Sequence, residues 1–205
     1  EYKDLFKKMV GSWRELWNQG AFPFYYAQIA PFDYARFHPQ DNLEKYNSAY
    51  LREAQLQASK EISNSGMAVL MDVGEKISIH PMDKEKGGKR LAYLALAKTY
   101  GLEGFEYESP VFRSIEIIES TVIVSFDNIP NGITSFWKEV KGFEIAGENK
   151  VFYPAQAIVR TKSVILSTPK VAKPLAVRYL FKNYAKAELF SGGGLPISSF
   201  RTDNW

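Results

Sequence analysis

Histidine is the side chain best suited to general base catalysis near neutral pH, and the sequence contains two histidines. His80 lies in the segment Ser78-Ile79-His80-Pro81, between an apolar run and a helical pattern. A loop in this position can hold an imidazole at the rim of a cleft, so His80 is the candidate general base. A surface or capping histidine is the alternative interpretation of the same position. We interpret His38, in Phe37-His38-Pro39, as an ordinary loop residue.

A histidine base deprotonates a nucleophile and is oriented by an acid. The sequence offers candidates for the acid but none for the nucleophile. Asp72 and Glu75 are nearby carboxylates that could orient the imidazole, or they could simply end a strand. Neither a G-x-S-x-G nor a G-D-S segment is present. The serines that neighbour a glycine do not follow a predicted strand in a tight turn; they are Ser12, Ser65 and Ser191. The residues therefore predict a base without its nucleophile.

Two glycine-bearing segments resemble phosphate sites in composition alone. Residues 192–194 are successive glycines, but no G-K-S/T follows them and no predicted helix begins there. Residues 84–90 (KEKGGKR) form a charged, glycine-interrupted helix start, which we interpret as a solvated face. Neither segment predicts phosphate binding.

The first hundred residues predict the order helix, strand, helix, strand, helix. Apolar residues recur every three or four positions over residues 2–17, 43–58 and 84–100, which is typical of helices that bury one face. The apolar runs at residues 22–30 and 67–73 predict strands buried on both faces, as in a parallel sheet. This alternation favours an α/β layer in which helices cross between parallel strands.

Local signals mark the ends of these helices. Asp41 and Glu44 have the spacing of a capping box for the second helix. Gly20 and Gly101 can adopt the left-handed conformation that ends a helix, so we expect them to end the first and third helices.

Functional residues of such a layer lie in the loops that follow the carboxyl ends of the strands. Those loops are residues 31–40 and 74–82, and the second contains His80.

From about residue 105 the apolar period falls from 3.6 to 2. Two pairs of alternating segments flank short polar turns: residues 114–117 with 122–126, and residues 157–160 with 163–166. Each pair predicts a hairpin. Residues 142–145 and 175–179 are two more candidate strands. This half predicts a small antiparallel β-sandwich.

The change of period places a domain boundary near residues 101–104. The predicted fold class is therefore α/β followed by all-β, with an α/β domain at residues 1–103 and a β-sandwich domain at residues 104–205.

Composition excludes several functional classes. The chain has 205 residues, 45% of them hydrophobic and 24% charged, with a net charge of +3. Neither half has the basic surplus of a nucleic-acid binder, and no apolar run approaches the ~20 residues that cross a membrane. Zero cysteines exclude thiolate metal sites, thiol nucleophiles and disulfides. Because the chain opens on Glu1 and enters a helical pattern at once, we expect it to be the C-terminal part of a longer precursor.

Several segments are similar to the sialate O-acetylesterases, a family of carbohydrate esterases among the SGNH/GDSL hydrolases. The similarity keeps order and spacing along essentially the whole chain. It is carried by residues 22–28 (FPFYYAQ), 51–55 (LREAQ), 66–69 (GMAV), 79–81 (IHP), 90–92, 95–101, 142–147, 174–179, 194–196 and 200–203.

The resemblance implies the C-terminal half of an SGNH-type parallel α/β layer with an appended antiparallel β-sandwich. His80 falls on the family's catalytic histidine, and the nucleophilic serine and oxyanion donors are expected upstream of Glu1, in a missing N-terminal half of the same enzyme. Members of the family often carry an acid before the histidine, where this sequence has Ser78 and Ile77. Glu75, Asp72 or a backbone carbonyl would then orient the imidazole.

The implied activity is removal of acetyl groups from sugar hydroxyls, typically the 9-O-acetyl of sialic acid, without a metal or cofactor. The resemblance also implies a secreted or periplasmic protein, and we expect the 205-residue chain alone to be inactive. An esterase of the same family that acts on acetylated xylan or another glycan is one alternative. The other is a non-catalytic carbohydrate-binding fragment that uses aromatic residues of the second half, namely Phe112, Phe126, Trp137, Phe143, Phe152 and Tyr153.

Overall fold

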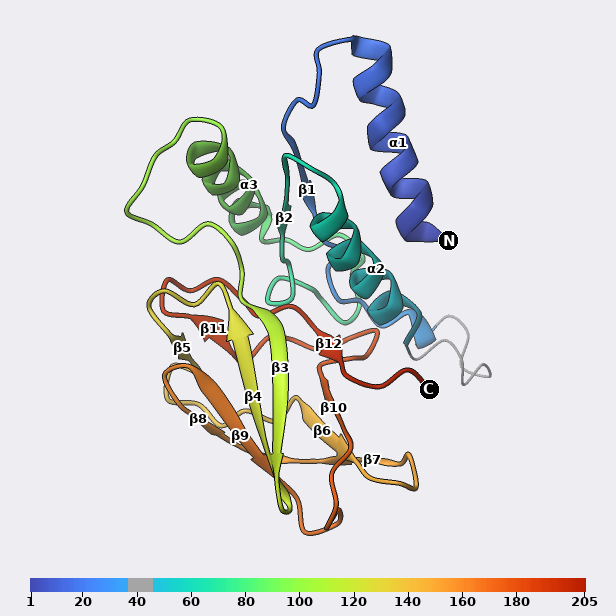
Figure 1. The fold of residues 1–205 in the computed structure, drawn as a ribbon, viewed down its shortest axis with the longest axis vertical. Helices are drawn as coiled ribbons and strands as arrows, with labels where there is room; N and C mark the ends of the chain where they lie inside the picture. The colour runs from blue at the N-terminus through green and yellow to red at the C-terminus, as the bar shows by residue number, and fades with distance from the viewer. Residues whose placement is uncertain (37–45) are drawn as a thin grey trace.

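The computed structural model describes residues 1–36 and 46–205. Three helices gather around a pair of strands in one part of the molecule, and antiparallel sheets form the other (Figure 1). The fold therefore combines helices with antiparallel sheets, as the change of period near residue 105 predicts. Within the described residues, no helix combines the length and apolar character needed to cross a bilayer.

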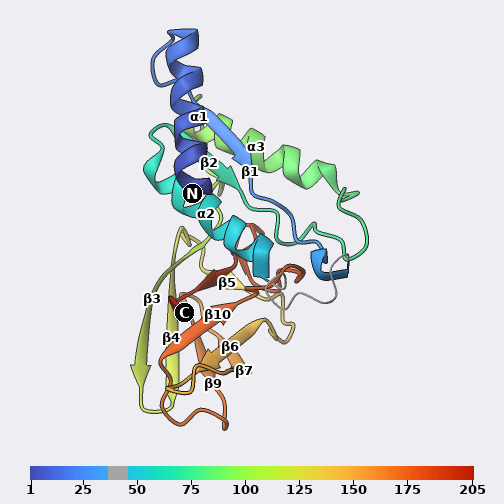
Figure 2. The same cartoon turned by 90° about the vertical axis from the view of Figure 1, so that its right-hand side faces the viewer.

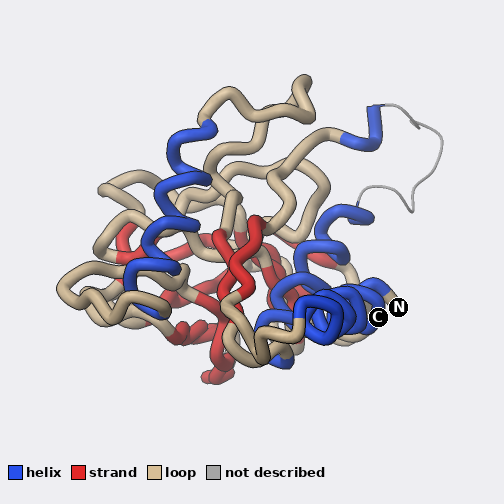
Figure 3. Tube along the Cα trace, turned by 90° about the horizontal axis from the view of Figure 1, so that it is seen from above, coloured by secondary structure: helices blue, strands red, loops and turns tan. Residues whose placement is uncertain are grey.

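The helical part has the predicted order of elements. Its members are α1 (Tyr2–Trp17), β1 (Phe24–Ala27), a short 3-10 helix η1 (Tyr34–Arg36), α2 (Asn47–Glu61), β2 (Ser65–Ala68) and α3 (Lys84–Lys98). β1 and β2 pair in parallel, from Phe24 opposite Ser65 to Ala27 opposite Ala68. The pair lies between α3 on one side and α1 with α2 on the other (Figure 3). The predicted parallel strands with a helical crossover are confirmed.

Both strands are shorter than the apolar runs predict. β2 is buried throughout, as expected, but no residue of β1 is fully buried, so the expectation of a doubly buried first strand is wrong. After Ala68 the chain leaves the pair, because its carbonyl groups bond elsewhere: Val69 accepts from Arg90, and Met71 accepts from the backbone of Ala187. Tertiary partners therefore end the strand inside an apolar run.

The helices end close to where they are predicted to end. Asn18 is the left-handed residue that caps α1 (φ 49°), with its N–H bonded back to Arg14 and Glu15, and Gly20 is also left-handed (φ 65°) two residues later. The helical residues of α3 end at Lys98, and Gly101 then adopts the predicted left-handed conformation (φ 70°), with the Leu102 N–H bonded back to the Leu96 carbonyl at 3.0 Å. The predicted capping box at Asp41 and Glu44, like His38, lies outside the described residues, and α2 begins at Asn47.

The second part contains two four-stranded antiparallel sheets and one small strand pair. One sheet has the order β3-β4-β9-β8, the other β12-β10-β6-β7, and β11 pairs with β5. The predicted hairpins are present as β3–β4 and β8–β9. The strands are β3 (Val111–Ile118), β4 (Thr121–Asp127), β5 (Ile133–Thr134), β6 (Phe143–Ala146), β7 (Phe152–Pro154), β8 (Gln156–Val159), β9 (Ser163–Ser167), β10 (Ala176–Tyr179), β11 (Phe190–Ser191) and β12 (Phe200–Arg201).

One hydrophobic core joins both four-stranded sheets to the helical part. Val124 of β4 and Leu166 of β9 belong to the same buried cluster as Ile145 of β6 and Val177 of β10. Each such side chain contributes about 1.5–3 kcal/mol of burial free energy. Met67, Val69 and Met71 extend the cluster into β2 and the turn after it. The division at residues 101–104 remains a prediction, because the core crosses it.

The C-terminal segment returns to the helical part and bonds to it through buried polar groups. Gln28 donates to the Ser198 hydroxyl at 3.0 Å, and the Arg52 Nε donates to the Ser199 hydroxyl at 3.1 Å. Residues after β1 and within α2 therefore meet residues 198–199 next to the carboxyl end of β1.

Candidate active site

His80 lies on the loop of residues 74–82, which leads from β2 to α3. The loop is closed by the Met82 N–H, which donates to Glu75 Oε1 at 2.8 Å. The Ser78 hydroxyl bonds to both backbone groups of His80, at 3.3 Å to the nitrogen and 3.1 Å to the oxygen. Asp83 then caps α3 by accepting from the Lys86 N–H. Local hydrogen bonds thus shape the loop while the imidazole stays exposed to solvent.

The loop after β1 and the loop after β2 meet at the same edge of the strand pair. A β-carbon at Gly74 would lie 2.3 Å from the carbonyl oxygen of Pro31, so this close approach requires glycine. The loop before α3 and the segment that contains η1 accordingly lie on the same side of the molecule (Figure 2). Carboxyl edges of parallel strands are the usual place for ligand sites in α/β layers.

A pocket of about 280 Å³ opens at this edge beside His80. Ile79 and Pro81, on either side of the histidine, contribute to its wall. The rest of the lining comes from residues 27–30 after and within β1, from Leu70 and Val73, and from Asp83, Lys84 and Gly87 at the start of α3. His80 itself does not line the pocket, but an exposed imidazole between two lining residues can exchange a proton with a substrate bound there.

Asp72, one of the two predicted orienting acids, pairs with Arg90 instead of the imidazole. Its two oxygens accept from the guanidinium at 2.6 and 2.7 Å, and both side chains are nearly buried. The Lys86 ammonium lies 3.7 Å away. The ion pair offsets the cost of burying the Arg90 guanidinium, and it directs this carboxylate toward α3.

Glu75, the other predicted acid, is bonded to the backbone of its own loop through Met82. In the described part of the chain, the hydrogen bonds of His80 all involve Ser78. The structure therefore brings Glu75 and His80 onto one loop but does not bring either carboxylate into a hydrogen bond with the ring.

The serines beside glycines lie away from this pocket. Ser65 is buried in β2 and donates to the Ile62 carbonyl at 2.8 Å, while Ser191 accepts from Leu195 in the second part. Ser12 lies in α1. None of the three lines the pocket beside His80.

The two glycine-bearing segments contact acidic side chains. The Gly193 N–H donates to a Glu106 carboxylate oxygen at 3.0 Å, which leaves no room there for a phosphate of the same charge. Lys86 and Lys89 pair with neighbouring acids on the surface of α3. Among residues 1–36 and 46–205, no group of three or more His, Cys, Asp or Glu side chains gathers as a metal site.

Two buried polar residues behind the pocket are missed by reasoning from the sequence. Gln28 lines the pocket and is fully buried, with its amide nitrogen bonded to the Arg52 carbonyl and to Ser198. Arg52 is also fully buried and donates to the hydroxyls of Ser48 and Ser199 and to the Lys182 carbonyl. Burial lowers the pKa of Arg52 to about 10. The one signal in the sequence is a polar residue, Gln28, inside an apolar run.

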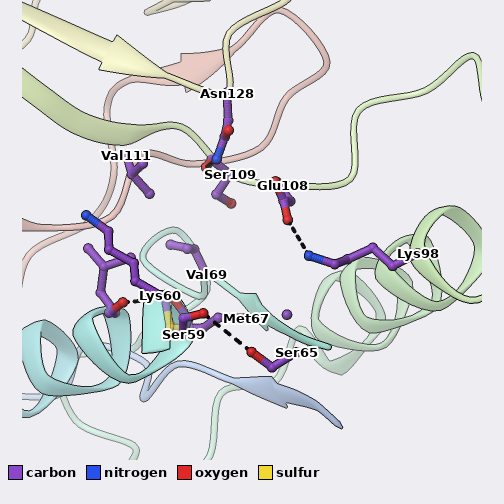
Figure 4. A pocket seen from close by; sticks show the side chains of 12 residues that line it. Ser59, Lys60, Ser65, Met67, Val69, Lys98, Glu108, Ser109, Val111 and Asn128 are labelled. Carbon is purple, nitrogen blue, oxygen red and sulfur yellow. Dashed lines mark hydrogen bonds and ion pairs between the residues drawn. The ribbon is translucent and has the colours of Figure 1, made fainter. Parts of the chain in front are cut away.

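A different pocket, of about 200 Å³, lies along the edge of β2 that pairs with no described strand (Figure 4). Ser59 and Lys60 of α2 border one side, and the ion pair between Lys98 and Glu108, at 2.8 Å, borders another. No residue of the His80 loop lines it. The pocket beside His80 is therefore the better candidate for chemistry.

Comparison with known proteins adds the following. No family model matches the chain. The sialate O-acetylesterase of Homo sapiens is 27% identical over 128 residues, which are 57% of this chain and 24% of that protein. The enzyme of the same name from Rattus norvegicus is 26% identical over 161 residues, 71% of this chain and 28% of that protein. The crystal structure of a carbohydrate acetylesterase from Xanthomonas citri matches all of this chain with a TM-score of 0.89 and 33% identity.

These matches cover only part of each relative. The chain spans about a quarter of the curated proteins and 46% of the solved chain. Likeness in sequence and likeness in fold nevertheless point to the same group of enzymes. In sequence the chain is similar to the sialate O-acetylesterases, and in sequence and fold it is similar to a carbohydrate acetylesterase.

Proposed function

We propose that this chain carries the general base, His80, of a carbohydrate O-acetylesterase. The observation that supports this most strongly is the exposed imidazole beside a pocket at the carboxyl edge of β1 and β2. The reaction is inferred from the relatives, which are named as a sialate O-acetylesterase and a carbohydrate acetylesterase. The substrate is an O-acetylated sugar.

In the proposed reaction a serine from an upstream segment attacks the acetyl carbonyl. His80 takes the hydroxyl proton as the Ser–acetyl bond forms, and donors around the oxyanion each contribute about 3 kcal/mol. His80 then gives that proton to the departing sugar alkoxide as the ester bond breaks. Water, deprotonated by His80, releases acetate and restores the serine. Glu75 positions the base by closing its loop through Met82.

The free edge of β1 is where we propose that the upstream half joins. Phe24 and Gln28 direct their N–H groups to β2, so Tyr25 and Ala27 direct theirs to the opposite edge, where no described strand lies. On neighbouring α1, the exposed fractions of Leu16 and Trp17 are 78% and 60%. A two-stranded parallel sheet is too small to be stable alone, so further strands at this edge would complete an SGNH-type layer. The second part would be its appended β-sandwich, and the complete protein would be secreted or periplasmic.

The proposed substrate is 9-O-acetylated sialic acid, and acetylated xylan or another glycan ester is the alternative within the same chemistry. A non-catalytic carbohydrate-binding fragment is favoured by one observation: Trp137 is completely exposed. Phe126 and Phe143 are buried in the core and cannot contact a sugar. Comparing acetate release from 9-O-acetyl sialic acid and from acetyl-xylan decides between the esterases.

The proposal is tested by His80→Ala in the complete protein. We expect turnover of 4-nitrophenyl acetate to fall by roughly a thousandfold or more, with an unchanged circular dichroism spectrum. Ile77→Ala is the matched control, because Ile77 is an exposed residue of the same loop that does not line the pocket. Equal activity of His80→Ala and the wild type would eliminate His80 as the base. The 205-residue chain alone is expected to be inactive, and normal turnover by it would contradict the need for an upstream serine.

A further inference from the structure

The pocket along the free edge of β2 adjoins a second hollow, beside the segment that leads from α3 to β3. The first has a volume of about 200 Å³ and the second about 150 Å³, and Glu108 and Asn128 line both. Together they reach the lower end of the usual volumes of small-molecule sites, about 300 Å³. No residue of the His80 loop lines either hollow. The two hollows form one groove, which we call the β2-edge groove.

Backbone donors and acceptors of β2 face this groove. The Gln28 N–H donates to the Ala68 carbonyl, which fixes the alternation of backbone groups along the parallel pair. The N–H and C=O groups of Ser65 and Met67 therefore point away from β1, toward the groove that both residues line. No backbone hydrogen bond joins them to another residue within the described ranges. Because β2 is buried, these groups need partners that a ligand or water supplies.

The charged side chains that line the groove balance one another. Lys98 pairs with Glu108 at 2.8 Å (Figure 4). Lys60 lines the first hollow and forms no ion pair with a described residue, while Glu106 lines the second hollow. Two ammonium groups thus face two carboxylates, so the groove has no net charge that selects an ion. This balance favours a neutral ligand.

Two aromatic rings border the second hollow. Phe105 and Tyr107 both line it, with their ring centroids 6.5 Å apart in an edge-on arrangement. Tyr93 packs against Phe105 with centroids 5.6 Å apart. Both lining rings are half-buried, so each is held by its neighbours and still offers apolar surface to a ligand.

An added peptide strand fits this edge poorly. β2 spans only Ser65–Ala68, so its free edge presents the backbone groups of two residues, a ladder shorter than strands usually form. A sugar ring matches the groove better, because its hydroxyls both donate and accept hydrogen bonds and its C–H faces pack against aromatic rings.

We propose that the β2-edge groove is a second, non-catalytic binding site for a neutral stretch of a glycan chain. The sugar hydroxyls bond to the backbone of Ser65 and Met67 and to the Lys60 ammonium, and Tyr107 packs against a ring face. The site holds a glycan chain independently of the pocket beside His80. This inference rests on the proposed function for the class of ligand, and it adds a place where unacetylated sugars bind.

The test measures binding of sugars that carry no acetyl ester. Xylotetraose and lactose are titrated into the complete protein by isothermal calorimetry. At least one of them is expected to bind with a dissociation constant on the order of 1 mM. Tyr107→Ala and Lys60→Ala should each raise that constant by roughly threefold to tenfold, because each removes one contact. Turnover of 4-nitrophenyl acetate by both variants should equal that of the wild type, which shows that they fold.

Tyr100→Ala is the matched control, since Tyr100 is exposed and lines neither hollow. His80→Ala should also leave the dissociation constant unchanged. Absence of binding by both sugars, or binding that survives both Tyr107→Ala and Lys60→Ala, overturns the inference and leaves the esterase proposal intact. Binding that is lost in His80→Ala overturns it as well, because the sugar then occupies the pocket beside His80. Failure of the esterase proposal is seen separately, as equal turnover by His80→Ala and the wild type.

Discussion

At the scale of residues, the charged groups near the candidate site fall into two kinds. His80 and Lys76 are exposed and available to a ligand, whereas Asp72 and Arg90 neutralise each other between β2 and α3. The bidentate geometry of that pair joins the start of the loop to the helix after it. In the structure Asp72 therefore stabilises the fold through Arg90 and forms no hydrogen bond with the imidazole.

Asp72→Asn separates these two roles. Removing the carboxylate charge leaves Arg90 buried without its partner, so we expect the free energy of unfolding to fall by about 3 kcal/mol. The kcat per folded molecule of the complete protein should change by less than about twofold. Urea denaturation and initial rates measure the two quantities.

The control is Asp127→Asn, because Asp127 and Arg113 form an exposed pair at 3.9 Å. That change should lower the free energy of unfolding by less than about 1 kcal/mol. A large loss of kcat in Asp72→Asn with undiminished stability would instead favour Asp72 as the acid that orients His80.

At the scale of elements, α1 is held to α2 by packing on one side and by charge on the other. Val10 of α1 is buried against Ala58 and Ile62 at the end of α2. Lys3 and Lys7 both donate hydrogen bonds to the Glu61 carboxylate. The exposed apolar face of α1 is separate from this contact, which leaves it available to the upstream half that we propose.

The α1–α2 contact should weaken in acid. The hydrogen bonds from Lys3 and Lys7 lower the pKa of Glu61 from 4.5 to about 2. Because the folded pKa is depressed, the stabilisation is complete above the unfolded pKa of 4.5 and is lost as the pH falls toward 2. Glu61→Gln should therefore be less stable than the wild type at neutral pH, with a difference that shrinks between about pH 4.5 and 2.

Urea denaturation at a series of pH values measures this difference. Glu148→Gln is the control, since Glu148 is exposed and forms no ion pair within the described residues. If the difference in the free energy of unfolding between the wild type and Glu61→Gln stays constant down to pH 2, Lys3 and Lys7 do not stabilise the Glu61 carboxylate.

At the scale of the whole molecule, the helical part and the sheets share one core. Met67, Val69 and Met71 pack with the inward side chains of both four-stranded sheets. Arg201 pairs with Glu53 of α2 at 3.0 Å, which adds a polar link from β12. These contacts predict that the two parts lose structure together.

We expect the 205-residue chain to unfold in a single transition. Ellipticity at 222 nm reports mainly the helices, all of which precede residue 99. Fluorescence of Trp137 and Trp205, in a background with Trp13→Phe and Trp17→Phe, reports the second part. Coincident midpoints in urea would support one cooperative unit. Separate midpoints would instead support independent domains divided near residues 101–104.

The sequence by itself determined the elements whose pattern depends on neighbours along the chain. The apolar spacing of residues 2–17 predicts α1 with its observed bounds, and the alternating residues predict both hairpins. The loop that bears His80 also follows from local order, because a strand and a helix flank it. These features need no knowledge of distant partners, since period and turn residues act over a few positions.

The tertiary structure alone decided which polar groups meet. Asp72 is close enough to His80 in the sequence to have contacted it. Instead, both of its oxygens accept hydrogen bonds from the buried guanidinium of Arg90, 18 positions away. Gln28 bonds to the hydroxyl of Ser198, 170 residues later in the chain, and Arg52 to that of Ser199, 147 residues later. Strand ends, buried charges and pockets depend on such distant pairings, because a polar group leaves water only where the fold brings a partner to it.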